Sequence, residues 1–176
     1  MTIMRQRAWR ACQGAAVLFI MGAMGAPALG QNAIAAAPPG FGWTGQSVIL
    51  AVHGVGAQIY ACLPQAAGGN AWTFREPIAS LLADGKTVGR HYAGPTWQLT
   101  QGGGVKGVVQ ASAPGATPAD VPLLKLGVTE HIGDGPLSVA TTILRLNTKG
   151  GVLDGPCETA GELRAAPYSA DYLFLR

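Results

Sequence analysis

From residue 43 onward, hydrophobic and polar positions form short apolar or alternating runs that are separated by glycine-rich turns. The run at 48–52 is apolar on both faces, as in a buried strand, and in the last run Tyr168, Ala170, Tyr172 and Phe174 share one face. Strands at roughly ten-residue spacing with such turns predict an all-β fold. We therefore expect one domain built as an antiparallel β-sandwich or barrel.

Two hairpins are expected, each around a short turn that separates two strand-like runs. Asp84-Gly85 lies between the runs 79–83 and 87–92, and Gly102-Gly103-Gly104 lies between 96–100 and 105–111. Further strands are expected at 57–63, 121–128 and 137–148, and Leu144 and Leu146 alternate with Arg145 and Asn147 in the last of these. The clearest helix signal, 77–83, competes with the first hairpin. Little helix is therefore expected outside the N-terminal segment.

The N-terminal segment has the order of a secretory signal peptide. Arg5, Arg7 and Arg10 precede the uncharged run 14–26, and Ala28-Leu29-Gly30 gives a small-x-small cleavage pattern. An uncleaved anchor is the alternative, but spanning a bilayer takes about 20 apolar residues and this run is shorter. Cleavage is expected after Gly30, or alternatively near 35–37. Residues 1–30 would then be the signal peptide, 31–42 an Ala/Pro/Gly-rich tether and 43–176 the β domain.

Export changes the charge of the protein. Three of the 12 Lys and Arg residues lie in the first 30 positions, and none of the 9 Asp and Glu residues does, so 9 of each sign remain. A domain with zero formal net charge lacks the basic surface that nucleic acid or an anionic membrane attracts. We expect a periplasmic or extracellular protein that binds no nucleic acid and has no integral membrane segment after cleavage.

Two cysteines, Cys62 and Cys157, remain after loss of Cys12 with the signal peptide. Two cysteines in an oxidising compartment usually pair, so a Cys62–Cys157 disulfide is expected. Two buried free thiols are the alternative. A metal site on these cysteines is disfavoured, because neither has a second Cys or a His at ligand spacing.

No complete catalytic or cofactor motif is present, and we expect no cofactor. Gly54-Val55-Gly56 resembles the start of a dinucleotide fingerprint, but the third glycine position is Ile59 and a strand-like run follows. The glycines are therefore interpreted as a turn between two strands, and the chain is not expected to be an NAD-dependent dehydrogenase. Serine catalysis lacks a Gly-x-Ser-x-Gly elbow.

The three histidines beyond the signal peptide, His53, His91 and His131, fall at expected strand ends or turns. Three imidazoles can bind Zn²⁺ or Cu²⁺, but their spacing matches no local metal motif, and only the fold could bring them together. The alternative is three separately hydrogen-bonded histidines.

The segment 89–97 combines a cation, an imidazole, a phenol and an indole with a Gly-Pro turn. Arg90, His91, Tyr92 and Trp97 are therefore candidate ligand-binding residues for a sugar or another small molecule. In the competing interpretation Trp97 belongs to the core and His91 fixes the turn.

Several motifs, in order along nearly the whole chain after the signal peptide, resemble a family of exported proteins, the domain of unknown function 3455. The matching pieces are the segments 52–62, 72–74, 91–97 and 145–151, Cys157, and the segment 167–172. The family has no established activity, so the resemblance implies no catalytic residue. One departure is at 121–124, where Leu123 follows the proline and relatives are expected to carry a Trp.

Two functions fit these observations. The first is an exported β domain without catalysis that binds a small molecule, a glycan or an envelope component. The second is a small extracytoplasmic enzyme, metal-assisted and centred on His91 with His53 or His131. Clustering of the histidines in a concave pocket would favour the enzyme, and separately bonded histidines would favour the binding module.

Overall fold

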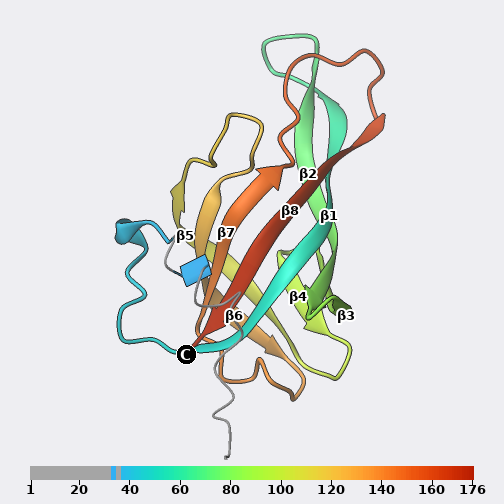
Figure 1. Ribbon diagram of the computed structural model, residues 1–176. Helices are drawn as coiled ribbons and strands as arrows, with labels where there is room; N and C mark the ends of the chain where they lie inside the picture. Colours follow the sequence, from blue (N-terminus) through green and yellow to red (C-terminus); the bar gives the residue numbers. More distant parts are fainter. Residues whose placement is uncertain (1–32, 35–36) are drawn as a thin grey trace, which may run out of the picture.

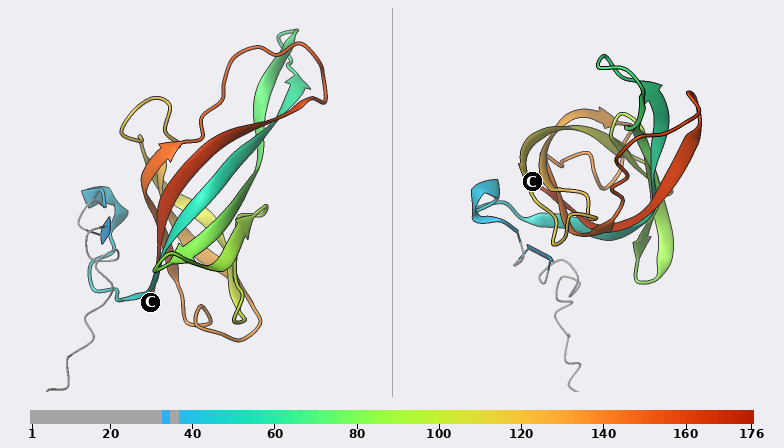
Figure 2. Two further views of the ribbon diagram at one scale, coloured as in Figure 1. Left: turned by 45° about the vertical axis from the view of Figure 1, so that its right-hand side comes forward. Right: turned by 90° about the horizontal axis from the view of Figure 1, so that it is seen from above.

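The computed structural model describes residues 33–34 and 37–176 and shows one antiparallel sheet closed into a barrel (Figures 1 and 2). Each strand pairs with the next along the chain, and the last pairs with the first. The strands are β1 (Val48–Pro64), β2 (Asn70–Ala83), β3 (Lys86–Tyr92), β4 (Thr96–Leu99), β5 (Gly104–Ala113), β6 (Leu123–Ile132), β7 (Thr142–Gly150) and β8 (Leu163–Leu175). The prediction of an all-β antiparallel domain is confirmed, with the sheet closed as a barrel. A short 3-10 helix, η1 (Pro39–Phe41), precedes β1.

The interior of the barrel follows the period-two alternation of its strands. Tyr168, Ala170, Tyr172 and Phe174 of β8 are all buried in one apolar cluster, as the pattern predicts. Leu137, from the loop between β6 and β7, belongs to the same cluster. This loop therefore closes the end of the barrel at which β1 begins and β8 ends.

Both expected hairpins form. Asp84 and Gly85 have φ angles of 49° and 73° between β2 and β3, the positive values that a type I′ turn requires. Gly102 and Gly103 have φ angles of 104° and 77° between β4 and β5. The competing helix over 77–83 does not form, because these residues are part of β2.

The glycine turn expected at 54–56 is wrong, because β1 runs unbroken through these residues. Their glycines serve close packing instead. A Cβ at Gly54 would lie 2.7 Å from the ring of Tyr172, and one at Gly56 would overlap the carbonyl oxygen of Ile78. The glycines therefore let the aromatic core approach β1 and let the backbones of β1 and β2 lie close together.

A second apolar cluster covers the outside of the barrel wall. It contains Leu144 and Leu146 of β7 together with Leu173 and Leu175 of β8. Ala33 and Phe41 of the N-terminal segment pack on these leucines and are buried. The described part of the expected tether thus lies against the barrel and shields an apolar outer surface from water.

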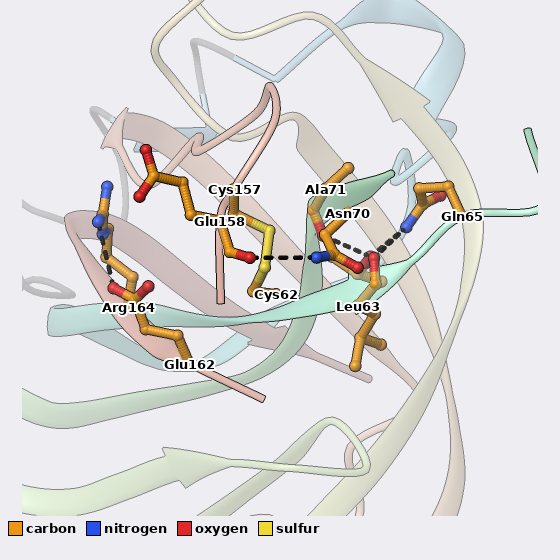
Figure 3. Close-up of a disulfide and its surroundings, with 10 residues drawn as sticks. Cys62, Leu63, Gln65, Asn70, Ala71, Cys157, Glu158, Glu162 and Arg164 are labelled. Carbon is orange, nitrogen blue, oxygen red and sulfur yellow. Dashed lines mark hydrogen bonds and ion pairs between the residues drawn. A yellow bond between two sulfur atoms is a disulfide. The ribbon is translucent and has the colours of Figure 1, made fainter. Parts of the chain in front are cut away.

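The Cys62–Cys157 disulfide is present and joins residues 95 positions apart, with a Cα–Cα distance of 5.9 Å (Figure 3). It ties the end of β1 to the loop between β7 and β8. Backbone bonds surround it: the N–H of Cys62 donates to the carbonyl of Glu162 at 2.9 Å, and the N–H of Cys157 donates to that of Asn70 at 3.1 Å. The predicted disulfide is confirmed, and it fixes this loop to the β1–β2 hairpin.

Within residues 33–34 and 37–176, no helix has both the length and the apolar character needed to cross a membrane.

Candidate ligand pocket

The barrel wall is incomplete beyond the turn at 93–95 of the short β3–β4 hairpin. β3 pairs with β2 from Ala79 to Ala83, so within the described chain residues 73–78 of β2 have a paired strand only in β1, and the first residues of β2 also bond to the β7–β8 loop. β4 pairs with β5 only as far as Lys106, and the rest of β5 pairs only with β6. The uneven strand lengths therefore leave an opening in the side of the barrel, between β2 and β5.

A pocket of about 530 Å³ lies inside the barrel at this opening. Most of its lining is apolar or aromatic, and no Asp or Glu contributes to it. A volume of this size falls within the range of small-molecule sites in proteins, roughly 300–1,000 Å³. Residues that line it include Gln58, Tyr60, Phe74, Arg75, Pro77, His91, Pro95, Trp97, Val109, Val121, Leu124 and Arg145.

Stacked aromatic rings form the inner wall of the pocket. His91 and Trp97 are cross-strand partners on β3 and β4, and their rings stack at a centroid distance of 4.3 Å with planes 10° apart. Tyr172 approaches both rings, at 5.2 Å and 5.5 Å. The turn at Gly94-Pro95 thus brings His91 and Trp97 together inside the barrel.

Burial keeps this wall uncharged. His91 is buried, and desolvation lowers its pKa from 6.5 to about 4. The hydrogen bond from His91 Nδ1–H to the carbonyl oxygen of Thr96, 2.8 Å long, opposes that decrease, and the positive charge of Arg145 adds to it. Burial also raises the pKa of Tyr172 well above its usual value. At neutral pH the imidazole and the phenol are therefore both neutral.

The four candidate residues of segment 89–97 divide between the two faces of the sheet. His91 and Trp97 are buried inside, whereas Arg90 and Tyr92 lie outside with Gln98. The Arg90 guanidinium donates to Gln98 Oε1 at 2.8 Å and lies 4.9 Å from the centre of the Tyr92 ring. One binding surface cannot include all four side chains.

The three histidines have separate partners. His53 contacts Asp171 with an Nδ1–Oδ1 distance of 2.7 Å, and Asp171 accepts a second bond from Asn147 Nδ2 at 2.8 Å. His131 Nε2–H donates to the carbonyl oxygen of Ala140 at 2.9 Å. Among the described residues, no three His, Cys, Asp or Glu side chains are grouped closely enough to hold a metal ion.

Sequence reasoning missed the polar residues of the pocket. Gln58 and Tyr60 come from β1 and Arg145 from β7. Tyr60 donates from its hydroxyl to the carbonyl oxygen of Gly151 at 2.8 Å, which holds the β7–β8 loop over the pocket. Arg145 alternates with buried leucines and so resembled a solvent-facing position. One signal in the sequence could have identified Arg145: it is a cation in the middle of a strand whose other face is apolar.

A family model described as a protein of unknown function (DUF3455) matches residues 43–176 of the chain. The chain belongs to this family. No curated protein and no solved structure matches it significantly. The DUF3455 match covers every strand of the barrel and all the pocket residues, so the pocket lies within the family domain.

Proposed function

We propose that this DUF3455 domain is an exported, non-catalytic protein that binds one small, mostly apolar ligand inside its barrel. The observation that carries the proposal is the open pocket of about 530 Å³, lined mainly by apolar and aromatic side chains. Eight-stranded barrels have interiors just wide enough to be filled by side chains or to hold one small ligand. Here the uneven lengths of the strands leave part of the interior open between β2 and β5.

The proposal of export depends on the signal-peptide pattern of residues 1–30, which lie outside the described residues. The Cys62–Cys157 disulfide supports it, since structural disulfides persist in oxidising compartments.

The alternative, an enzyme centred on His91 with His53 or His131, has less support. His91 lines the pocket, whereas His53 contacts Asp171 and His131 contacts Ala140. Separate bonding of the three imidazoles favours the binding module.

The test is titration with the neutral fluorescent probe N-phenyl-1-naphthylamine, whose emission rises in apolar sites. The purified mature protein should bind it with saturation at one site. Leu124→Trp fills the pocket, so it should weaken probe binding at least about tenfold, equivalent to ~1.4 kcal/mol. Val108→Trp is the matched control, because Val108 is 53% exposed on β5 and does not line the pocket.

Circular dichroism should show that both variants fold. Absence of saturable probe binding to the wild type, or equal binding by wild type and Leu124→Trp, would contradict the proposed function.

A further inference from the structure

Among the described residues that line the pocket, one cation has no carboxylate partner. Arg145 lies on β7 and is partly buried, and its Nε and Nη2 atoms donate to the carbonyl oxygen of Pro122 at 3.0 Å and 2.9 Å. All nine Asp and Glu residues of the chain lie in its described part, and none forms an ion pair with Arg145 there. By contrast Arg75, at the rim, pairs with Glu76 at 3.2 Å.

Two buried hydrogen-bond donors accompany this cation. Gln58 is 2% exposed and Trp97 is 1% exposed, and both line the pocket. Gln58 Nε2 and Trp97 Nε1 have no hydrogen-bond partner in the described structure. Buried donors without a partner are rare in folded proteins, and such groups require an explanation. Neighbouring side chains cover both nitrogen atoms, so these donors do not face the open space of the pocket directly.

The charge lies on the far side of the barrel from the opening. In the closed ring of eight strands, β7 is four strands from β3, so Arg145 projects from the wall opposite the β3–β4 hairpin. The pocket lining at the opening includes two half-exposed apolar side chains, Phe74 of β2 and Val109 of β5. A ligand in this pocket therefore meets a cation within and hydrocarbon at the exit of the pocket.

From this arrangement, and on the basis of the proposed function, we infer that the ligand is a monoanionic amphiphile with a carboxylate head and an apolar chain. The head would contact Arg145, whose planar guanidinium suits a carboxylate, and the chain would point toward the opening between β2 and β5. A single negative charge matches the single unpaired cation. The neutral His91 adds no second positive charge that a dianion would require.

The experiment compares dodecanoate with dodecan-1-ol, which has the same chain and no charge, as competitors of N-phenyl-1-naphthylamine at neutral pH. The wild type should bind dodecanoate at least about tenfold more tightly than the alcohol, a factor equivalent to ~1.4 kcal/mol. Arg145→Met should lose this preference while it still binds the probe and the alcohol. Arg164→Met is the matched control and should keep it, because Arg164 lies over Trp72 outside the pocket.

If Arg145→Met does not fold, Arg145→Gln replaces it, since its amide retains an N–H donor for Pro122, and the same loss of preference is expected. Equal affinity of the wild type for acid and alcohol overturns the inference but leaves the proposed function standing. A preference that persists in the folded Arg145 variant also overturns the inference. Failure of the wild type to bind the probe and both competitors overturns the proposed function itself.

Discussion

At the scale of single residues, His91 of β3 connects β3 to β4 in the wall of the pocket. Its ring stacks on Trp97, and its Nδ1–H donates to the carbonyl oxygen of Thr96 across the tight β3–β4 turn. Because the imidazole is buried in an apolar wall near Arg145, its protonation is disfavoured and its pKa falls to about 4. The same burial that shapes the pocket thus makes the fold sensitive to acid.

Stability should therefore fall as the pH decreases from 6.5 to 4. Above pH 6.5 His91 is neutral in both the folded and the unfolded chain, whereas between 6.5 and 4 only the unfolded chain binds the proton. The shift corresponds to about 3 kcal/mol of unfolding free energy. Urea unfolding of wild type and of His91→Phe at pH 7, 5.5 and 4 measures it. His91→Phe should show a smaller decrease, and His131→Gln, the control, should keep the full decrease. Parallel pH profiles for wild type and His91→Phe would refute this prediction.

At the scale of elements, the disulfide positions a wall of the pocket. The loop between β7 and β8 carries Val152, which lines the pocket, and Gly151, which accepts the bond from Tyr60. Cys157 anchors that loop to β1 at Cys62, and the N–H of Trp72 donates to the carbonyl oxygen of Gly155 at 3.1 Å. The disulfide and this backbone hydrogen bond therefore hold the loop in place.

Removing the disulfide should destabilise the protein by up to about 4–5 kcal/mol, because a cross-link over 95 positions restricts the unfolded chain. The variant Cys62→Ala/Cys157→Ala should show this loss in urea unfolding, and so should the wild type with dithiothreitol. Dithiothreitol should not change the double variant, which serves as the control. Free thiols in native protein purified without reductant, or equal stability of wild type and double variant, would argue against a structural bond.

At the scale of the whole molecule, the N-terminal segment completes the barrel wall from outside. Ala33 and Phe41 are 1% and 2% exposed and cover leucines of β7 and β8. Cleavage after Gly30 would keep this cover intact, whereas cleavage near 35–37 would remove Ala33 together with the signal peptide. The packing therefore favours the first of the two expected cleavage sites.

Intact mass of the protein exported by a bacterial host should therefore show loss of residues 1–30. The physical reason is that the expected signal ends at Ala28-Leu29-Gly30, before the segment that packs on the barrel. Loss of residues through 35–37 would contradict the packing argument, and full-length protein outside the cytoplasm would contradict the signal peptide altogether.

The sequence by itself indicated most of the strands, both hairpins, the inner face of β8 and the pairing of Cys62 with Cys157, but it divided β1 at 54–56 and began β7 at 137 instead of Thr142. These features depend on local signals: period-two alternation, turn residues that accept positive φ, and the chemistry of two cysteines in an oxidising compartment. The misread glycines at 54 and 56 show where local signals fail. Glycine marks a turn and a close packing contact equally well, and only the presence of Tyr172 and Ile78 opposite them decides.

The tertiary structure alone decided which face of β7 is inside. Leu144 and Leu146 have the pattern of core residues, yet they lie outside, because the N-terminal segment covers them. Arg145, which alternation with leucines would place in solvent, lies inside the barrel as a result. Alternation specifies two faces of a strand but not which one points inward when both can be covered. That choice depends on closure of the sheet and on packing by residues distant in sequence, and it is what creates the pocket.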